Sequence, residues 1–226
     1  VVCYGENNGS SAVNLLSGDV APVTYLWSNA STASSIISLS PNTYSVTVTN
    51  ANGCTATASV TISEPILVTL SASSTDVACN GNANGTITAS ASIGASITVN
   101  GNPYNPLATY GPGVYTVVAS APNGNGNGSC TASTIITITE PPVPVVTGTP
   151  NTASVCNLNP TNIALTSNVP STFSWTIGTT TGTVTGYSAG SGSTIAQTLT
   201  NGSNTTDATV EYIVTPTATP SGCPGT

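Results

Sequence analysis

The strongest constraint on the fold is an internal repeat whose period is the spacing from Cys3 to Cys79. The segment Cys3–Gly9 matches Cys79–Gly85, with glycines at the second and sixth positions after each cysteine. The copies also end alike, because Cys54–Pro65 and Cys130–Pro141 both run from a Cys-Thr-Ala triplet to a Glu-Pro pair. Two copies of one pattern predict two small domains of the same fold in tandem.

Glu-Pro junctions mark the domain boundaries. We predict three domains, which are residues 1–65, 66–141 and 142–226, the third with a different internal sequence. We call these three ranges modules. Proline favours an extended backbone, and short extended linkers between domains favour a rod.

Short alternating segments predict the secondary structure. Residues 43–48 read Thr-Tyr-Ser-Val-Thr-Val, which places Tyr44, Val46 and Val48 on one face of a strand. Asn50–Gly53 is a turn sequence. Many short strands between frequent turns predict β-sandwiches. The predicted strands are Ala12–Leu16, Val23–Trp27, Ser35–Leu39, Tyr44–Thr49, Thr55–Ile62, Thr86–Ala91, Ser96–Val99, Tyr115–Ala119, Thr131–Thr139, Ile163–Ser167, Phe173–Ile177, Thr194–Thr200 and Thr209–Thr215.

Six cysteines indicate an oxidising compartment, since none forms a C-x-x-C pair and the chain has no histidine. The spacing from Cys3 to Cys54 is identical to the spacing from Cys79 to Cys130. Equivalent modules are expected to form disulfides between equivalent cysteines. This predicts one disulfide within each module: Cys3–Cys54, Cys79–Cys130 and, by elimination, Cys156–Cys223.

The chain contains no Lys, Arg or His, and seven carboxylates give it a formal charge of −7. Without cations it cannot neutralise phosphates, so nucleic acid and anionic lipid surfaces are excluded as direct partners. The sequence contains no apolar run of about 18 residues, so no membrane span is predicted. Hydrophobic residues reach 38%, and their alternation with Ser and Thr argues against disorder.

The same composition argues against catalysis. Serine has no His or Lys base to activate it. Asp207 and Glu211 would lie about 13 Å apart on a strand, beyond the spacing of a glycosidase pair. We expect no catalytic residues and no cofactor. Glu6 and Asp19 could contribute to a calcium site, but solvated loop carboxylates are the preferred interpretation and no metal site is predicted.

Three aromatic side chains allow a sugar-stacking platform: Tyr25, Trp27 and Trp175. We favour the interpretation that both tryptophans fill sandwich cores, as the tryptophan of immunoglobulin-like domains does. Val99 stands where the repeat would place Trp27, and one apolar core residue can replace another.

Several of these segments resemble known families. The segments Cys3–Gly9, Thr24–Asn29 and Tyr44–Thr57 resemble the SprB repeat of giant adhesins from gliding bacteria of the Bacteroidetes group. The second module resembles a divergent copy, with a longer loop before Cys130. In the third module, Phe173–Thr176, Gly190–Ile195 and Val210–Pro216 resemble the PKD-like domains found beside those repeats.

The strand pattern and the proline junctions predict an all-β rod of tandem immunoglobulin-like β-sandwich domains. The resemblance implies export by type IX secretion and display on the cell surface. We expect an internal part of a longer protein that serves as a stalk segment in attachment and gliding. The expected partners are neighbouring repeats of the same chain, with surface polysaccharide bound by other parts of the protein. Two alternatives stay open: an array of glycan-binding modules, and a subunit of a self-assembling extracellular filament.

Overall fold

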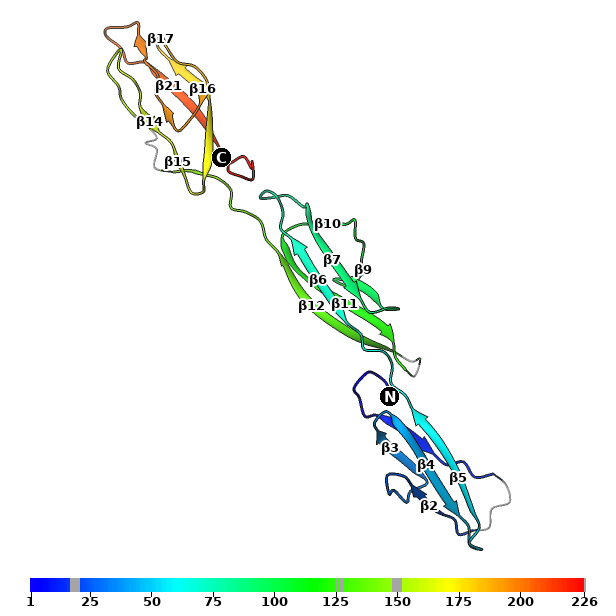
Figure 1. Cartoon of the computed structure of the whole chain (residues 1–226). Helices are drawn as coiled ribbons and strands as arrows, with labels where there is room; N and C mark the ends of the chain where they lie inside the picture. Colours follow the sequence, from blue (N-terminus) through cyan, green and yellow to red (C-terminus); the bar gives the residue numbers. More distant parts are fainter. Residues whose placement is uncertain (17–20, 125, 127, 148–151, 226) are drawn as a thin grey trace. The chain divides into compact units, whose positions relative to one another are not determined.

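The computed structural model describes residues 1–16, 21–124, 126, 128–147 and 152–225. These residues form strands, turns and irregular segments, and none of them lies in a helix (Figure 1). The all-β fold class is therefore confirmed. Within the described ranges there is no helix long and apolar enough to cross a membrane.

Strands occur in all three modules. The first contains β1 (Gly9–Ala12), β2 (Thr24–Trp27), β3 (Ser35–Leu39), β4 (Asn42–Thr49) and β5 (Thr55–Ile62). The second contains β6 (Leu70–Thr75), β7 (Gly85–Ala91), β8 (Ser96–Val99), β9 (Asn102–Pro103), β10 (Thr109–Tyr110), β11 (Gly113–Pro122) and β12 (Ser129–Ile138). The third contains β13 (Val146–Thr147), β14 (Ile163–Ala164), β15 (Thr166–Ser167), β16 (Ser171–Thr181), β17 (Val184–Thr185), β18 (Gly190–Ser191), β19 (Thr194–Ile195), β20 (Thr200–Asn201) and β21 (Thr209–Ala218).

The first module is built from sheets with the strand orders β1-β3 and β2-β4-β5. The antiparallel pair β4–β5 runs in unbroken register from Asn42 opposite Ile62 to Thr49 opposite Thr55. The alternation of β4 directs Tyr44 and Val46 into the core, as predicted, where Trp27, Ile36 and Leu39 pack with them. Val48 is half-buried against the same cluster.

The second module has the strand orders β10-β7-β6 and β12-β11-β8-β9. Val117 of β11 lies opposite Val99 of β8, and both side chains are buried. Val99 retains only 5% of its exposure, which agrees with its predicted place in a core.

The third module is organised around the long antiparallel pair β16–β21, to which β18 adds an edge strand. A bulge interrupts the register of the pair between Ile177 and Thr180. Phe173 and Trp175 alternate inward from β16 and pack against Leu165 and Ile195.

The structure divides into two compact units, and the second module contributes residues to both. The first unit comprises residues 1–74, 87–108 and 114–137, and the second comprises 75–86, 109–113 and 138–226. The two domain boundaries inferred from the sequence, after residues 65 and 141, stay a prediction.

Several strands differ from the sequence prediction. The predicted strand Ile163–Ser167 is divided into β14 and β15, and the predicted strand Thr194–Thr200 is divided between β19 and β20. The two-residue strands β9, β10, β13, β17 and β18 are not predicted. The sequence predicts the first strand at Ala12–Leu16, but β1 spans Gly9–Ala12, and Leu16 is 86% exposed. Strand β6 has no counterpart among the predicted strands. Its half-buried positions are filled by Leu70, Ala72 and Ser74, and only the first of these is a large apolar residue.

Candidate functional site: disulfides between modules

Two disulfides occur among the described residues, and both connect consecutive modules. Cys3 pairs with Cys130, and Cys79 pairs with Cys223, with Cα–Cα distances of 5.7 and 5.5 Å. Each disulfide lies within one of the two compact units. The first cysteine of one module is thus joined to the second cysteine of the next. We call Cys3, Cys79 and Cys156 the leading cysteines, and Cys54, Cys130 and Cys223 the trailing cysteines.

The predicted pairing within modules is therefore wrong. Cys54 and Cys156, expected in disulfides with Cys3 and Cys223, are free and exposed. Cys130 was expected to pair with Cys79 and instead pairs with Cys3.

The physical reason is that the two cysteines of the first module lie toward opposite ends of β5. Cys54 directly precedes Thr55, the first residue of that strand, in the turn that follows β4. The loop that carries Cys3 instead contacts the other end, because Gly9 packs against Ile62, the last residue of the strand. An eight-residue strand spans about 25 Å, far more than the roughly 7 Å between Cα atoms that a disulfide can bridge.

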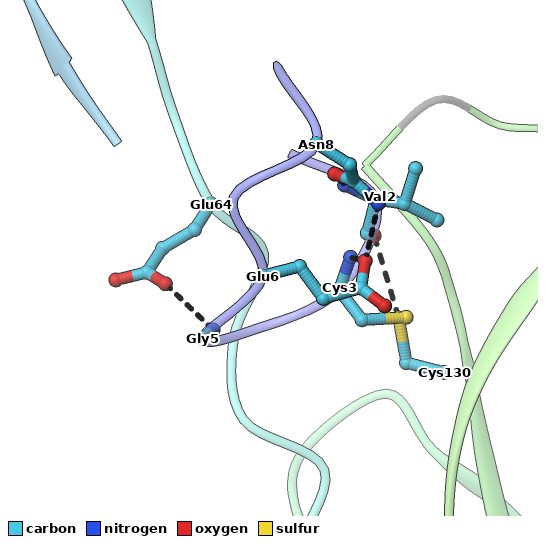
Figure 2. Close-up of a disulfide and its surroundings, with 7 residues drawn as sticks. All are labelled: Val2, Cys3, Gly5, Glu6, Asn8, Glu64 and Cys130. Atoms are coloured by element: carbon cyan, nitrogen blue, oxygen red, sulfur yellow. Dashed lines mark hydrogen bonds between the residues drawn. A yellow bond between two sulfur atoms is a disulfide. The ribbon is translucent and has the colours of Figure 1, made fainter. Parts of the chain in front are cut away.

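The loop that carries Cys3 is held by carboxylate and amide side chains (Figure 2). The side-chain oxygen of Asn8 accepts a hydrogen bond from the backbone N–H of Val2, at 2.9 Å. The Glu64 carboxylate accepts one from Gly5, at 3.0 Å. The Glu6 carboxylate accepts the N–H of Cys3 itself, at 2.8 Å. Each of these side chains satisfies a backbone donor that the irregular loop leaves without a strand partner.

Two of these hydrogen bonds recur one repeat later, around Cys79. Asn84 accepts from Ala78 at 2.9 Å, and Glu140 accepts from Gly81 at 3.0 Å. The repeat places Glu64 and Glu140 at equivalent junctions, but their role as acceptors was not predicted. The signal for it is that each stands at the same distance in sequence from its leading cysteine. The recurrence shows that the loop geometry belongs to the repeat.

The two disulfides also share their contact with the leading loop. The sulfur of Cys130 lies 3.4 Å from the carbonyl oxygen of Val2, and that of Cys223 lies 3.0 Å from the carbonyl oxygen of Ala78. Both carbonyls belong to the residue directly before a leading cysteine. At the first bridge, Gly124 also donates its N–H to the carbonyl of Val2 at 3.1 Å. The longer loop before Cys130 therefore contacts the segment that carries Cys3, the disulfide partner of Cys130.

Both tryptophans are core residues, as predicted. Trp27 is 3% exposed and donates its indole N–H to the carbonyl of Ala33 at 2.9 Å. Trp175 is 7% exposed and donates to the carbonyl of Ser188 at 3.2 Å. Tyr25 is half-buried against the core of the first module. Neither indole ring is presented as a flat surface for a sugar to stack on.

A polar network in the third module was not predicted from the sequence. The side-chain oxygen of Gln197 accepts the N–H of Ser188 at 2.9 Å and the hydroxyl of Tyr212 at 2.8 Å. Its amide nitrogen donates back to the carbonyl of Ser188. Burial raises the pKa of Tyr212. Because Ser188 also accepts the hydrogen bond of the Trp175 indole, the network holds the Ser188 loop against this ring, and the role of the network is structural.

Two exposed carboxylates have lowered pKa values. The backbone N–H of Thr139 donates to Asp76 at 2.7 Å and lowers the pKa of that carboxyl. The N–H of Thr179 does the same for the pKa of Glu211, at 2.9 Å. A hydrogen bond to the ionised form favours ionisation. Glu211 is thus a backbone acceptor on β21, and Asp207 is exposed in the loop before that strand.

Of the two candidate calcium ligands, only Glu6 lies among the described residues. Among the described residues, no group of three or more His, Cys, Asp or Glu side chains could hold a metal ion. Glu6 accepts hydrogen bonds from Cys3 and Asn8. Asp19 lies outside the described residues.

The described part of the chain includes a hollow in the first module and another beside the second disulfide. One, of about 520 Å³, is in the first module between β5 and the segment from Ser11 to Leu16, and Trp27, Val46 and Val48 also line it. The other, of about 400 Å³, adjoins the disulfide Cys79–Cys223 and is lined by Asn80, Asn82 and Pro142–Pro144.

Comparison with known families finds two matches. Residues 1–32 match the SprB repeat, and residues 153–226 match the PKD-like domain. These matches confirm the resemblance of the first module to the SprB repeat and of the third to the PKD-like domain, and the resemblance of the second module stays a prediction. This combination is typical of cell-surface proteins of the adhesin type, whose repeats are structural or adhesive modules. Disulfides fit an extracellular location. No curated protein matches the chain.

Proposed function

We propose that this chain is a load-bearing stalk segment of a secreted cell-surface adhesin that acts in surface attachment and gliding. In this role the modules hold a distal binding region away from the cell, and type IX secretion delivers the protein to the surface. The partners in this role are neighbouring repeats of the same polypeptide, and surface polysaccharide is bound elsewhere in the protein.

One observation supports this proposal above the others: each disulfide joins a module to the next one. A pull from a point before Cys3 to a point after Cys223 does not have to travel along the whole chain. The shortest covalent path crosses the disulfide from Cys3 to Cys130, follows the backbone back to Cys79 and crosses the second disulfide to Cys223. The bridges therefore limit how far the segment extends even after its strands have separated.

The limit can be expressed as a length. A fully extended chain spans about 3.5 Å per residue, so this path from Cys130 back to Cys79 limits the oxidised segment to roughly 180 Å between Cys3 and Cys223. With the disulfides reduced, the whole backbone between the same two points extends to roughly 770 Å. Disulfides within modules would give the same limit of roughly 180 Å, because the linkers Cys54–Cys79 and Cys130–Cys156 would then be the only extensible parts.

Single-molecule stretching of the whole chain, held at its two ends, measures this length. We expect a limiting extension of about 180 Å without reductant and about 770 Å with reductant, because only the oxidised chain has the shorter path. A limit that reductant does not change would contradict the load path.

The stalk role itself is tested on cells that display the full protein. Replacing Cys3, Cys79, Cys130 and Cys223 by serine should leave attachment in still medium unchanged, because binding lies elsewhere. Detachment under shear should rise, because the segment can now extend and unfold. Equal amounts of displayed protein are confirmed first.

The two remaining results each count against the stalk. Unchanged retention under shear would mean that the bridges carry no load. Loss of attachment in still medium would favour a binding module, which a glycan array with the isolated chain would then test.

A further inference from the structure

The three leading cysteines share one backbone geometry. The carbonyl of Cys3 accepts the N–H of Glu6 at 3.2 Å, that of Cys79 accepts Asn82 at 3.1 Å, and that of Cys156 accepts Asn159 at 3.0 Å. In each case the second residue after the cysteine has a positive φ: 78° at Gly5, 76° at Gly81 and 69° at Leu158. A positive φ at leucine is uncommon. The third module therefore forms the same cysteine loop even without the glycine.

The trailing cysteines Cys54 and Cys223 share a second geometry. Each directly follows a glycine with positive φ, which is 79° at Gly53 and 73° at Gly222. The carbonyl of Cys54 accepts the N–H of Asn50 at 3.0 Å, and that of Cys223 accepts the N–H of Ala218 at 2.8 Å. Both therefore stand at the end of a tight turn that follows a long strand, β4 or β21.

Each observed disulfide joins one cysteine of each kind, and the two free cysteines are also one of each kind. Cys54 is a trailing cysteine in the first module, and Cys156 is a leading cysteine in the third. The bridged trailing cysteines Cys130 and Cys223 are 8% and 3% exposed, whereas Cys54 is exposed. Cys130 and Cys223 are each covered by the loop of the leading cysteine to which they are bonded, and among the described residues Cys54 has no such loop beside it.

We propose that Cys54 and Cys156 are joining sites for further modules of the same kind. Cys54 takes the leading cysteine of a module placed before it, and Cys156 takes the trailing cysteine of a module placed after it. The partner module can belong to the same polypeptide or to a second copy of this chain, in which case Cys156 of one copy bonds to Cys54 of the other. The joining sites do not depend on the stalk role.

The chemistry is thiol–disulfide exchange with an external disulfide. Two thiols lose two protons and two electrons as the S–S bond forms, and the external disulfide takes them up and becomes two thiols. Oxidised glutathione supplies this oxidant in the experiment below.

The test mixes two variants of the whole chain. Cys54→Ser keeps only the free leading cysteine, and Cys156→Ser keeps only the free trailing cysteine. One variant is isotopically labelled, and the mixture is incubated in a buffer of reduced and oxidised glutathione. Mass spectrometry then separates the mixed dimer from the two like-with-like dimers. Mass mapping also confirms that Cys3–Cys130 and Cys79–Cys223 are intact in both variants.

We expect the mixed dimer to exceed each like-with-like dimer by about tenfold, the ratio that one or two well-formed hydrogen bonds at a docked junction produce. Random pairing gives only twice as much mixed dimer as either of the others, and that result would overturn the proposal. A bond between Cys54 and Cys156 within one unmutated chain would overturn it as well.

A matched control moves the thiol within the same turn. The variant Asn52→Cys with Cys54→Ser and Cys156→Ser carries its thiol at another exposed position, just before the trailing one. Mixed with the Cys54→Ser variant, it should pair at the random ratio. A preference as strong as that of Cys54 would mean that exposure rather than the junction selects the partner.

Mapping of the exported full-length protein distinguishes the two sources of the partner. A Cys54 peptide joined to a segment outside the present sequence identifies a module of the same polypeptide, and one joined to a Cys156 peptide identifies a second copy. Both results support the proposal. Free, alkylatable Cys54 and Cys156 in the exported protein would overturn it, and the load path through the two observed bridges would still stand.

Discussion

Gly9 and Gly85 occupy the same place in the two copies of the repeat, and both are buried at the first residue of a strand. A β-carbon at Gly9 would lie 2.7 Å from a methyl carbon of Ile62 and 2.9 Å from the carbonyl oxygen of Leu39. At Gly85 the corresponding methyl carbon belongs to Ile138, at 2.8 Å. The glycines are thus required by close packing at the point where each loop enters its sheet.

We therefore expect Gly9→Ala and Gly85→Ala each to lower the free energy of unfolding by about 1–3 kcal/mol, the usual effect of overpacking a filled site. Chemical denaturation of the oxidised chain measures the change. Gly111→Ala is the control, because the nearest atom to its added carbon is 3.9 Å away. Equal effects at all three positions would contradict the packing explanation.

At Asp76, the lowered pKa predicts a dependence of stability on pH. The folded protein holds the carboxylate in its ionised form through the N–H of Thr139. Because the folded pKa lies below the unfolded value of about 3.9, the stabilisation is complete above that value and is lost as the pH falls through the folded pKa. Asp76→Asn should therefore unfold at lower denaturant concentration than the parent at neutral pH, with the difference closing in strong acid.

Asp207→Asn is the matched control for this comparison, since Asp207 is an exposed carboxylate in a loop. A constant gap between the Asp76→Asn variant and the parent from neutral to strongly acid pH would rule out the charge of Asp76 as its cause.

Strand β3 shows how an element divides its residues between core and solvent. Ile36 is 4% exposed and packs with Trp27 and Leu39, while Ile37 is 73% exposed. Because the two residues have the same side chain and are neighbours in one strand, comparing substitutions at them isolates the effect of burial.

Ile36→Ala should cost about 2–5 kcal/mol of stability, as large-to-small substitutions in a core do. Ile37→Ala should change stability by no more than about 0.5 kcal/mol, as surface substitutions do. Thermal or chemical unfolding of both variants gives the comparison. Similar losses for the pair would mean that the first module does not pack as described.

Elements with strong apolar alternation could be predicted, and weakly marked ones could not. The predicted strands Ser35–Leu39, Thr55–Ile62 and Ser96–Val99 agree with the structure residue for residue. The predicted strand Ala12–Leu16 was placed wrongly because its apolar residues suggested a buried face, whereas Leu16 faces solvent. The two-residue strands pair over too short a length to leave a pattern in the sequence.

At the scale of the whole molecule, the repeat symmetry could not decide the cysteine partners. Bonding within each module, and bonding from each module to the next, both give equivalent cysteines equivalent partners. The spacing of the cysteines along the chain does not show which leading-cysteine loop lies beside which trailing cysteine. That depends on how Val2 and Gly124 meet, a contact between segments that are far apart in the sequence.

Cleavage after Asp and Glu, except before proline, tests the pairing directly. Glu64 and Glu140 precede prolines, so the oxidised chain should be cut after Glu6, Asp19, Asp76, Asp207 and Glu211. We expect fragments 1–6, 77–207 and 212–226 to stay joined and fragment 20–76 to be released with a free thiol. Mass spectrometry before and after reduction shows this, and fragment 1–6 attached to 20–76 would instead restore the pairing within modules.

The crossed order of the two bridges has a consequence for damage. Cys79 lies between Cys3 and Cys130 in the sequence, and Cys130 lies between Cys79 and Cys223, so the two closed loops overlap along the chain. A single backbone nick at any point from Cys3 to Cys223 leaves the two resulting parts covalently attached through a bridge. An extracellular protease must therefore hydrolyse this span at least twice before any piece of it is shed.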